Sequence, residues 1–132
     1  MTYKENIVLI KAYYGNPYVD DVMKKLSELK LQKRILYINE YGDNKYPKNG
    51  NMGTQIYGED DNMDYISSVI KDELLSNAYE IVVVDGDFQN FAPDIASKYD
   101  NIIFIFIVED LEKYNNEKEF LIIDLDDIKE AS

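Results

Sequence analysis

Two aspartates follow directly after a short, wholly apolar run. Residues 81–84 (Ile-Val-Val-Val) are all β-branched, which is typical of a strand buried on both faces of a parallel sheet. The run stops at Asp85-Gly-Asp87, and open α/β sheets bind ligands at the carboxyl ends of their strands. Carboxylate oxygens suit Mg²⁺. Asp85 and Asp87 are therefore the catalytic candidates if the protein is an enzyme, and Asp110 joins them if it holds a metal.

Two more predicted strands also end in acids. If all strands run parallel, these acids gather at one edge of the sheet, and two Mg²⁺ ions held there could drive phosphodiester cleavage without histidine. Each of these acids can equally be a solvated loop residue or a helix cap. The acids concerned are Glu109, Asp110, Asp124, Asp126 and Asp127, with Glu40 and Asp43 nearby.

Composition narrows the chemistry further. The 132 residues contain no Cys and no His, which excludes disulfides, thiolate zinc sites and His-containing triads. The longest apolar run, residues 102–108, is too short to span a membrane. The N-terminus enters a strand without a signal-peptide pattern. We therefore expect a single domain, residues 1–132, that is cytoplasmic and not inserted in a membrane.

The negative charge lies mostly in the second half of the chain. Residues 67–132 carry a net charge of −11, of a total of −12. Nucleic-acid binding needs a basic surface, so we do not expect a nucleic-acid partner. Cationic partners or divalent metals fit this charge better, although a solvated acidic surface is the ordinary explanation.

Periodicity predicts alternating strands and helices. The predicted strands are 6–12, 33–41, 79–85, 101–108 and 119–125, and the predicted helices begin at Asn16-Pro17, near Asp61 or Asn62, and near Pro93. Residues 42–61 show no periodicity and are expected to form a long loop. This order predicts a three-layer α/β sandwich with a mainly parallel, Rossmann-like sheet of about five strands.

The direction of the last strand is left open by the sequence. The stretch that leads to it from the preceding predicted strand, residues 110–118, holds only nine residues. That is short for a parallel crossover, so an antiparallel edge strand is one alternative.

The segment after the first strand could bind an anion, because free backbone N–H groups and the helix dipole meet there. Lys11-Ala-Tyr-Tyr-Gly15-Asn16-Pro17 resembles the deviant Walker A motif of the ParA/MinD ATPases, Lys-Gly-Gly-x-Gly-Lys-Thr. In this resemblance Lys11 is the signature lysine and Asp85 ends the Walker B strand. The resemblance covers residues 5–110 and implies a P-loop fold with nucleotide and Mg²⁺ as the related ligands.

The same segment departs from the family where phosphate chemistry is done. Asn16 and Pro17 stand at the positions of the phosphate-binding lysine and the magnesium-binding threonine, and Asn39 replaces an acid. The resemblance then implies a degenerate P-loop that has lost hydrolysis, as in family members that act as localisation or scaffold proteins. A generic α/β strand–turn–helix unit explains the segment as well. The binding candidates are Lys11, Tyr13, Tyr14, Gly15, Asn16, Asn39, Glu40 and Asp85.

Two weaker resemblances involve Asp85. Asp85-Gly-Asp-Phe88 with Pro93 is similar to a stretch of NYN/PIN-type nucleases, in which Asp85 and Asp87 match the acids. Asp85 also has the place of the phospho-acceptor in receiver domains. Both families need an acid after the first strand, where this chain has Lys11 and Ala12. A pseudo-receiver, which is not phosphorylated, is compatible with these residues.

Tyrosines gather near the same predicted edge. Tyrosine is enriched at protein interfaces, although half-buried structural rings account for many of them. The sequence thus favours a non-catalytic module that binds a protein partner or itself, without a required cofactor. The alternative is a Mg²⁺-dependent nuclease or phosphatase. The tyrosines in question are Tyr13, Tyr14, Tyr18, Tyr41, Tyr46 and Tyr57.

Overall fold

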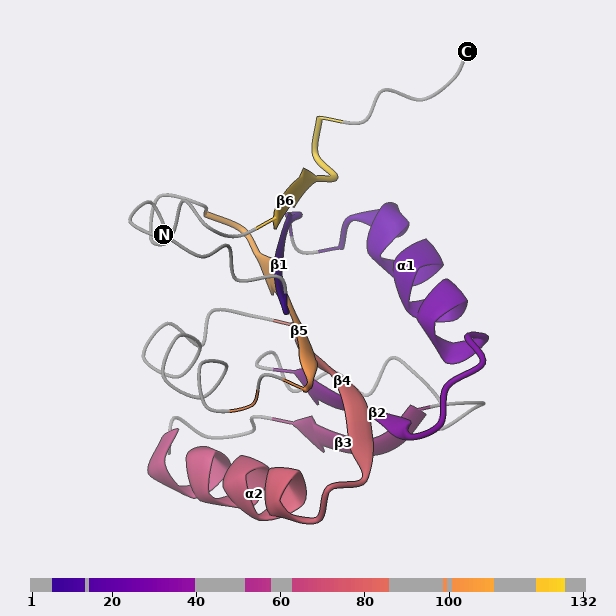
Figure 1. Ribbon diagram of the computed structural model, residues 1–132. Coiled ribbons are helices and arrows are strands. Elements are labelled where there is room, and N and C mark those ends of the chain that lie inside the picture. The colour runs from indigo at the N-terminus through magenta and orange to yellow at the C-terminus, as the bar shows by residue number, and fades with distance from the viewer. Residues whose placement is uncertain are drawn as a thin grey trace, which may run out of the picture.

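One parallel sheet organises the chain. The computed structural model describes residues 6–13, 15–39, 52–57, 63–85, 99, 101–110 and 121–127. Six strands pair in the order β3-β2-β4-β5-β1-β6, and every pairing is parallel (Figure 1). The strands are β1 (Ile7–Lys11), β2 (Arg34–Asn39), β3 (Met52–Tyr57), β4 (Tyr79–Asp85), β5 (Ile103–Val108) and β6 (Leu121–Asp124), and the helices are α1 (Pro17–Ser27) and α2 (Met63–Leu75).

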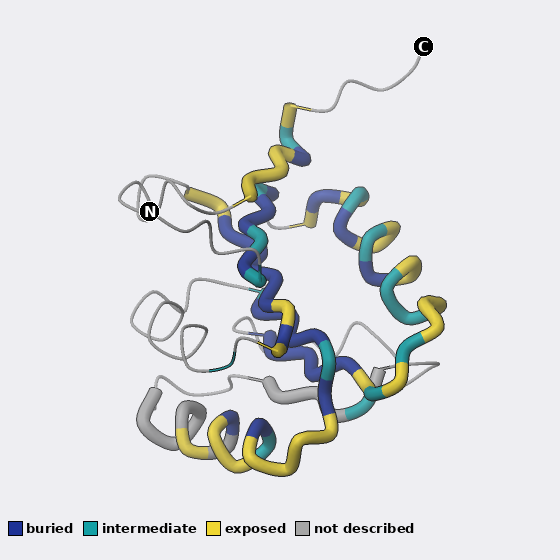
Figure 2. Tube along the Cα trace, in the orientation of Figure 1, coloured by how far each residue is buried: buried dark blue, intermediate teal, exposed yellow. Residues whose placement is uncertain are grey.

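The two helices cover opposite faces of the sheet (Figure 1). Val19 and Met23 of α1 pack with one set of buried strand residues, and Ile70 and Leu74 of α2 pack with the alternate set. The connection from β1 through α1 to β2 and the connection from β3 through α2 to β4 cross the sheet in opposite directions. Because both crossovers have the same handedness, their helices lie on opposite faces. These layers confirm the predicted α/β sandwich. Figure 2 shows that burial concentrates along β2, β4, β5 and β1.

Helix α1 begins where the sequence predicts. Asn16 is the N-cap, and its Oδ1 accepts a hydrogen bond from the Tyr18 backbone N–H at 2.9 Å. Pro17 occupies the first helical turn, where its missing N–H and fixed φ are no disadvantage. Gly15 precedes the cap with φ at +89°, a conformation that other residues rarely adopt. The chain therefore turns sharply from β1 into α1.

Strand β3 lies inside the segment 42–61 that the sequence predicts to be a loop, and that prediction is wrong for residues 52–57. The strand Met-Gly-Thr-Gln-Ile-Tyr has no apolar alternation because it is an edge strand, paired only with β2 in the described sheet. A β-carbon at Gly53 would lie 3.1 Å from Arg34 Nε. This close approach explains a glycine within a strand.

Strand β6 runs parallel to β1, so the antiparallel alternative is not the one adopted. The described strand is Leu121–Asp124, and residues 119 and 120 of the predicted strand lie outside the described residues; β5 ends at Val108. Between Val108 and Leu121 the chain has 12 residues, about the dozen that a parallel crossover needs. The Leu125 N–H then donates to the Lys11 carbonyl at 2.8 Å, continuing the ladder beyond the strand.

Some predictions fall outside the described residues. These are the helix predicted from about Pro93, the cap of α2 at Asp61 or Asn62, and the loop residues 42–51 and 58–61. In the ranges that the structure describes, no helix has the length and apolar character needed to cross a membrane.

The centre of the sheet generates a stability prediction. Phe104 on β5 is fully buried and stacks on Phe106, with ring centroids 6.2 Å apart. Phe104→Ala is expected to lower the free energy of unfolding by about 3–5 kcal/mol, because it leaves a cavity between sheet and helix. Urea denaturation measures this loss. The neighbouring Ile103 is 45% exposed, so Ile103→Ala should cost about 1 kcal/mol or less; equal losses would contradict the assigned faces of β5.

Candidate functional site

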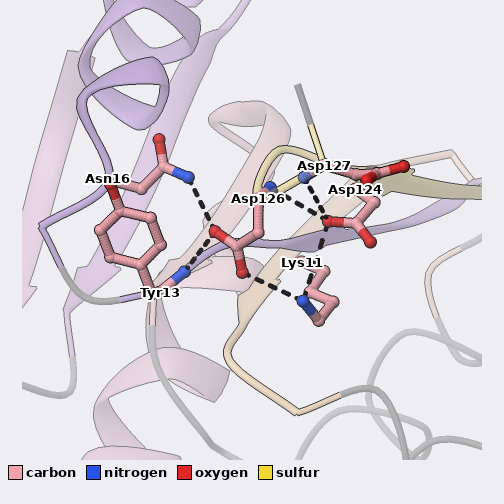
Figure 3. A network of polar contacts seen from close by, with 6 residues as sticks. All are labelled: Lys11, Tyr13, Asn16, Asp124, Asp126 and Asp127. Atoms are coloured by element: carbon pink, nitrogen blue, oxygen red, sulfur yellow. Dashed lines mark hydrogen bonds and ion pairs between the residues drawn. The ribbon is translucent and has the colours of Figure 1, made fainter. Parts of the chain in front are cut away.

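A carboxylate from the end of the chain lies in the loop between β1 and α1. Asp126 Oδ1 accepts hydrogen bonds from the Tyr13 backbone N–H at 2.9 Å and from Asn16 Nδ2 at 2.8 Å. Asp126 Oδ2 accepts one from Lys11 Nζ at 3.1 Å (Figure 3). Three donors from the segment between the end of β1 and the start of α1 thus contact a single carboxylate. The segment before α1 thus binds an anion that belongs to the protein itself, through one backbone N–H and two side chains.

Asp124 fixes the position of this carboxylate. Its Oδ1 accepts the backbone N–H groups of Asp126 and Asp127 at 3.0 and 3.2 Å, which closes a tight turn directly after β6 (Figure 3). The same oxygen lies 3.8 Å from Lys11 Nζ. Lys11 and Asp124 are register partners on β1 and β6, so the parallel pairing of these strands brings the lysine and both acids together.

The electrostatics of the cluster favour its charged form. Burial pushes the pKa of Asp126 upward, but the hydrogen bonds from the Tyr13 N–H, Asn16 and Lys11 outweigh it and lower the pKa below the usual 3.8. The hydrogen bond to Asp126 is the main reason why the pKa of Lys11 rises above 10.5, with Asp124, Asp126 and Asp127 adding attraction and partial burial opposing it. The Asp126 side chain is 20% exposed and that of Lys11 31%.

Asn16 takes part in two structural contacts at once. It is 3% exposed; its Oδ1 caps α1 and its Nδ2 binds Asp126. The backbone around it is also engaged, since the Asn16 N–H donates to the Tyr13 carbonyl and the Val19 N–H donates to the Asn16 carbonyl. Asn16 therefore holds the loop before α1 and the turn after β6 together.

A second polar cluster lies at the ends of β2 and β4. The Tyr37 hydroxyl donates to Asp85 Oδ2 at 2.7 Å, and Asn39 Nδ2 donates to the same hydroxyl at 2.8 Å. Tyr37 and Asn39 are buried, and Asn39 pairs with Asp85 in the strand register. Alternation along the strands places all three on the sheet face that α1 covers. Buried polar groups of this kind are stable because they satisfy one another.

The structure thus separates the predicted site residues into two groups. It brings Lys11, Tyr13 and Asn16 together in one, and Asn39 and Asp85 in the other. Strand β5 lies between β1 and β4, so Lys11 and Asp85 are about 10 Å apart across the sheet. Lys11 is two residues from Leu9 in β1, so both side chains lie on the same face of the sheet, opposite to the face that holds Tyr37.

The remaining predicted residues have different outcomes. Gly15 forms the turn before α1, and Asp110 lies exposed after β5. Tyr14, Glu40 and Asp87 lie outside the described residues. The ring of Tyr13 is 54% exposed, and Tyr18 packs partly buried beside the core under α1. Tyr41 and Tyr46 are outside the described ranges, and Tyr57 ends β3.

Asp126 is the central residue that the sequence did not identify as a binding residue. Its only signal was its place just beyond the last strand, in Asp124-Leu-Asp126-Asp127. This position indicates a contact with the β1–α1 loop only when β6 is known to run parallel to β1 and beside it. Within the described part of the chain, no group of three or more His, Cys, Asp or Glu side chains is arranged to hold a metal ion.

The cluster generates a stability prediction. Asp126→Ala removes the acceptor of three donors, so the free energy of unfolding should fall by about 1–3 kcal/mol. Thermal or urea unfolding measures the change. Asp127→Ala is the matched control, because Asp127 contributes its backbone N–H to the turn and its side chain is exposed. A loss at Asp127 equal to that at Asp126 would contradict the assigned role of the Asp126 carboxylate.

A pH dependence follows from the lowered pKa of Asp126. A carboxyl whose pKa is lower in the folded state stabilises the fold above its unfolded value and loses that contribution as the pH falls through the folded value. The difference in Tm between the wild type and Asp126→Asn is therefore expected to be full near pH 6 and to shrink below about pH 4. A difference that grows on acidification would contradict this. Thermal scans from pH 3 to pH 7 measure it.

Comparison with known proteins identifies no relative of this chain. No protein-family model, no curated protein and no solved structure matches it. The contacts of Lys11, Asn16 and Asp126 therefore carry the functional proposal.

Proposed function

We propose that this domain is a non-catalytic, protein-binding module, of the localisation or scaffold type, in which the ancestral or apparent phosphate loop serves a structural purpose. The single observation that carries this proposal is the Asp126 carboxylate held by Lys11, the Tyr13 N–H and Asn16. A phosphate at this loop would compete with a negatively charged group that already has three donors. We also propose, from the sequence, that the protein is cytoplasmic and does not bind nucleic acid.

The departures from a working P-loop support the same proposal. A nucleotide site needs groups that can reach phosphate and magnesium. Asn16 is buried in the cap of α1, and Pro17 has no hydroxyl. Lys11 is paired with Asp126. Asp85 accepts the Tyr37 hydroxyl on the other face of the sheet. A degenerate ParA/MinD-like module and a pseudo-receiver are both compatible with this arrangement.

A Mg²⁺-dependent nuclease or phosphatase is the second candidate. The observation in its favour is the parallel direction of β6, which places the ends of all six strands at one edge. Asp85 ends β4 and Asp110 follows the neighbouring strand β5. Asp124 ends β6, however, three strand spacings from Asp85, or about 14 Å. Two-metal sites need ions about 4 Å apart, so Asp85 and Asp124 would not share one.

Ligand-dependent melting separates these functions. ATP or GTP with Mg²⁺, and Mg²⁺ or Mn²⁺ alone, are expected to leave the Tm of the wild type unchanged in a thermal-shift assay. Inorganic phosphate is expected to raise the Tm of Asp126→Ala but not that of the wild type, because the variant frees the three donors Lys11 Nζ, the Tyr13 N–H and Asn16 Nδ2. A saturable rise in the wild type with nucleotide would overturn the proposal. A rise with Mg²⁺ that Asp85→Asn abolishes would favour the enzyme.

A further inference from the structure

Strand β6 ends the sheet on the side of β1. The Leu125 N–H points to β1, where it donates to the Lys11 carbonyl. Backbone groups alternate in direction along a strand, so Leu121 and Ile123 also face β1, and the backbone groups of Ile122 and Asp124 face outward. In the described sheet, β6 has a hydrogen-bonded neighbour on one side only. The outward groups are a template for pairing with another strand.

Three of the four side chains of β6 are apolar, and they are exposed on both faces of the sheet. Leu121 and Ile122 are each 49% exposed and Ile123 is 41% exposed. Figure 2 shows this strand as exposed beside the buried β1. Proteins commonly protect an edge strand with lysines, proline or a bulge. Here three consecutive apolar residues lie at the edge, and exposed apolar surface of this kind marks an interaction site.

Acidic residues surround the carboxyl end of this edge. Glu109 and Asp110 follow β5, and Asp124, Asp126 and Asp127 end β6. In the described residues at the carboxyl ends of β1, β5 and β6, Lys11 is the single base, and it is paired with Asp126. The described charges at this end of β6 are therefore mostly negative, which favours a partner with positive charge.

A second copy of the chain fits this edge poorly. Each copy has a net charge of −12, and two β6 strands side by side would bring their acidic ends close together. A stable protein interface buries at least about 1,200 Å², and four residues paired with four supply only a small part of that area. A short extended segment of another protein meets neither difficulty, because strand addition gains affinity from backbone hydrogen bonds and alternate side chains.

We propose that β6 is a docking edge for an extended segment of a partner protein, apolar at alternate positions and carrying Lys or Arg where it passes Asp124 and Asp127. The segment pairs with the outward backbone groups of Ile122 and Asp124 and covers the exposed side chains of Leu121, Ile122 and Ile123. This inference rests on the proposed protein-binding function and names the partner chemistry and the strand that it uses.

The probe is a fluorescein-labelled peptide, Lys-Thr-Val-Thr-Val-Lys-Lys, compared with its counterpart in which every Lys is Glu. Fluorescence anisotropy with the full chain should show the basic peptide binding about tenfold more tightly, or better, than the acidic one. Ile122→Lys should weaken the basic peptide about tenfold or more, since it removes apolar cover and adds a like charge. Leu75→Lys is the matched control, because Leu75 is 73% exposed at the end of α2, and should leave binding unchanged.

Two further measurements keep the test independent of folding effects at Ile122. Asp127→Lys changes an exposed side chain and should reduce the preference for the basic over the acidic peptide. Residue-resolved amide exchange should show new protection at Ile122 and Asp124 on binding, with Leu121 and Ile123 little changed because they already face β1.

Each outcome decides the inference. Failure of both peptides to bind, or binding without protection of Ile122 and Asp124, overturns the docking edge, while the proposed function stands if nucleotides still leave the Tm unchanged. A nucleotide-dependent rise in Tm overturns the proposed function instead. A wild-type dimer in light scattering that Ile122→Lys converts to monomer assigns the edge to a second copy and overturns the partner named here.

Discussion

The capture of Asp126 by the β1–α1 loop connects the two ends of this fold. Strand β6 pairs with β1 over four residues, and short edge strands with exposed side chains gain little from burial. The hydrogen bonds from Lys11, the Tyr13 N–H and Asn16 add a charged anchor just beyond the strand. Asp124 orients this anchor through the backbone of Asp126. One carboxylate thus links β6, the turn into α1 and the residue that caps that helix.

This anchor also determines what the rest of the sheet edge can do. The start of α1 offers the N–H groups and dipole that usually attract phosphate, but in this fold an internal carboxylate uses the donors beside it. The other polar cluster, Tyr37, Asn39 and Asp85, lies two strands away and on the opposite face from Lys11. The groups that a combined nucleotide and magnesium site would need are therefore divided between two places. The side chains of both clusters hydrogen-bond to other groups of the protein, which favours a structural role for the clusters.

Local features of this fold could be predicted from sequence, and long-range ones could not. The β-branched run of β4 and the Asn16-Pro17 start of α1 have signals within a few residues. Strand β3 has no such signal, because an edge strand containing Gly53 needs neither apolar alternation nor a continuous apolar run. The contact between Asp126 and Asn16 spans 110 residues. Hydrophobic periodicity cannot show this contact, because the contact forms only if β6 runs parallel to β1. The direction of β6 is not encoded in a local pattern.

The anchor and the exposed strand are physically coupled, because Asp126 follows β6 after a single residue. Any segment that pairs with β6 would hold that strand against β1, and so would favour the position in which Asp126 fills the loop. Conversely, an anion that displaced Asp126 from Lys11 and Asn16 would loosen the end of β6. Coupling between two sites is reciprocal in free energy, so occupants of the edge and of the loop would oppose each other. The carboxylate that closes the loop between β1 and α1 thereby also stabilises the exposed edge strand β6.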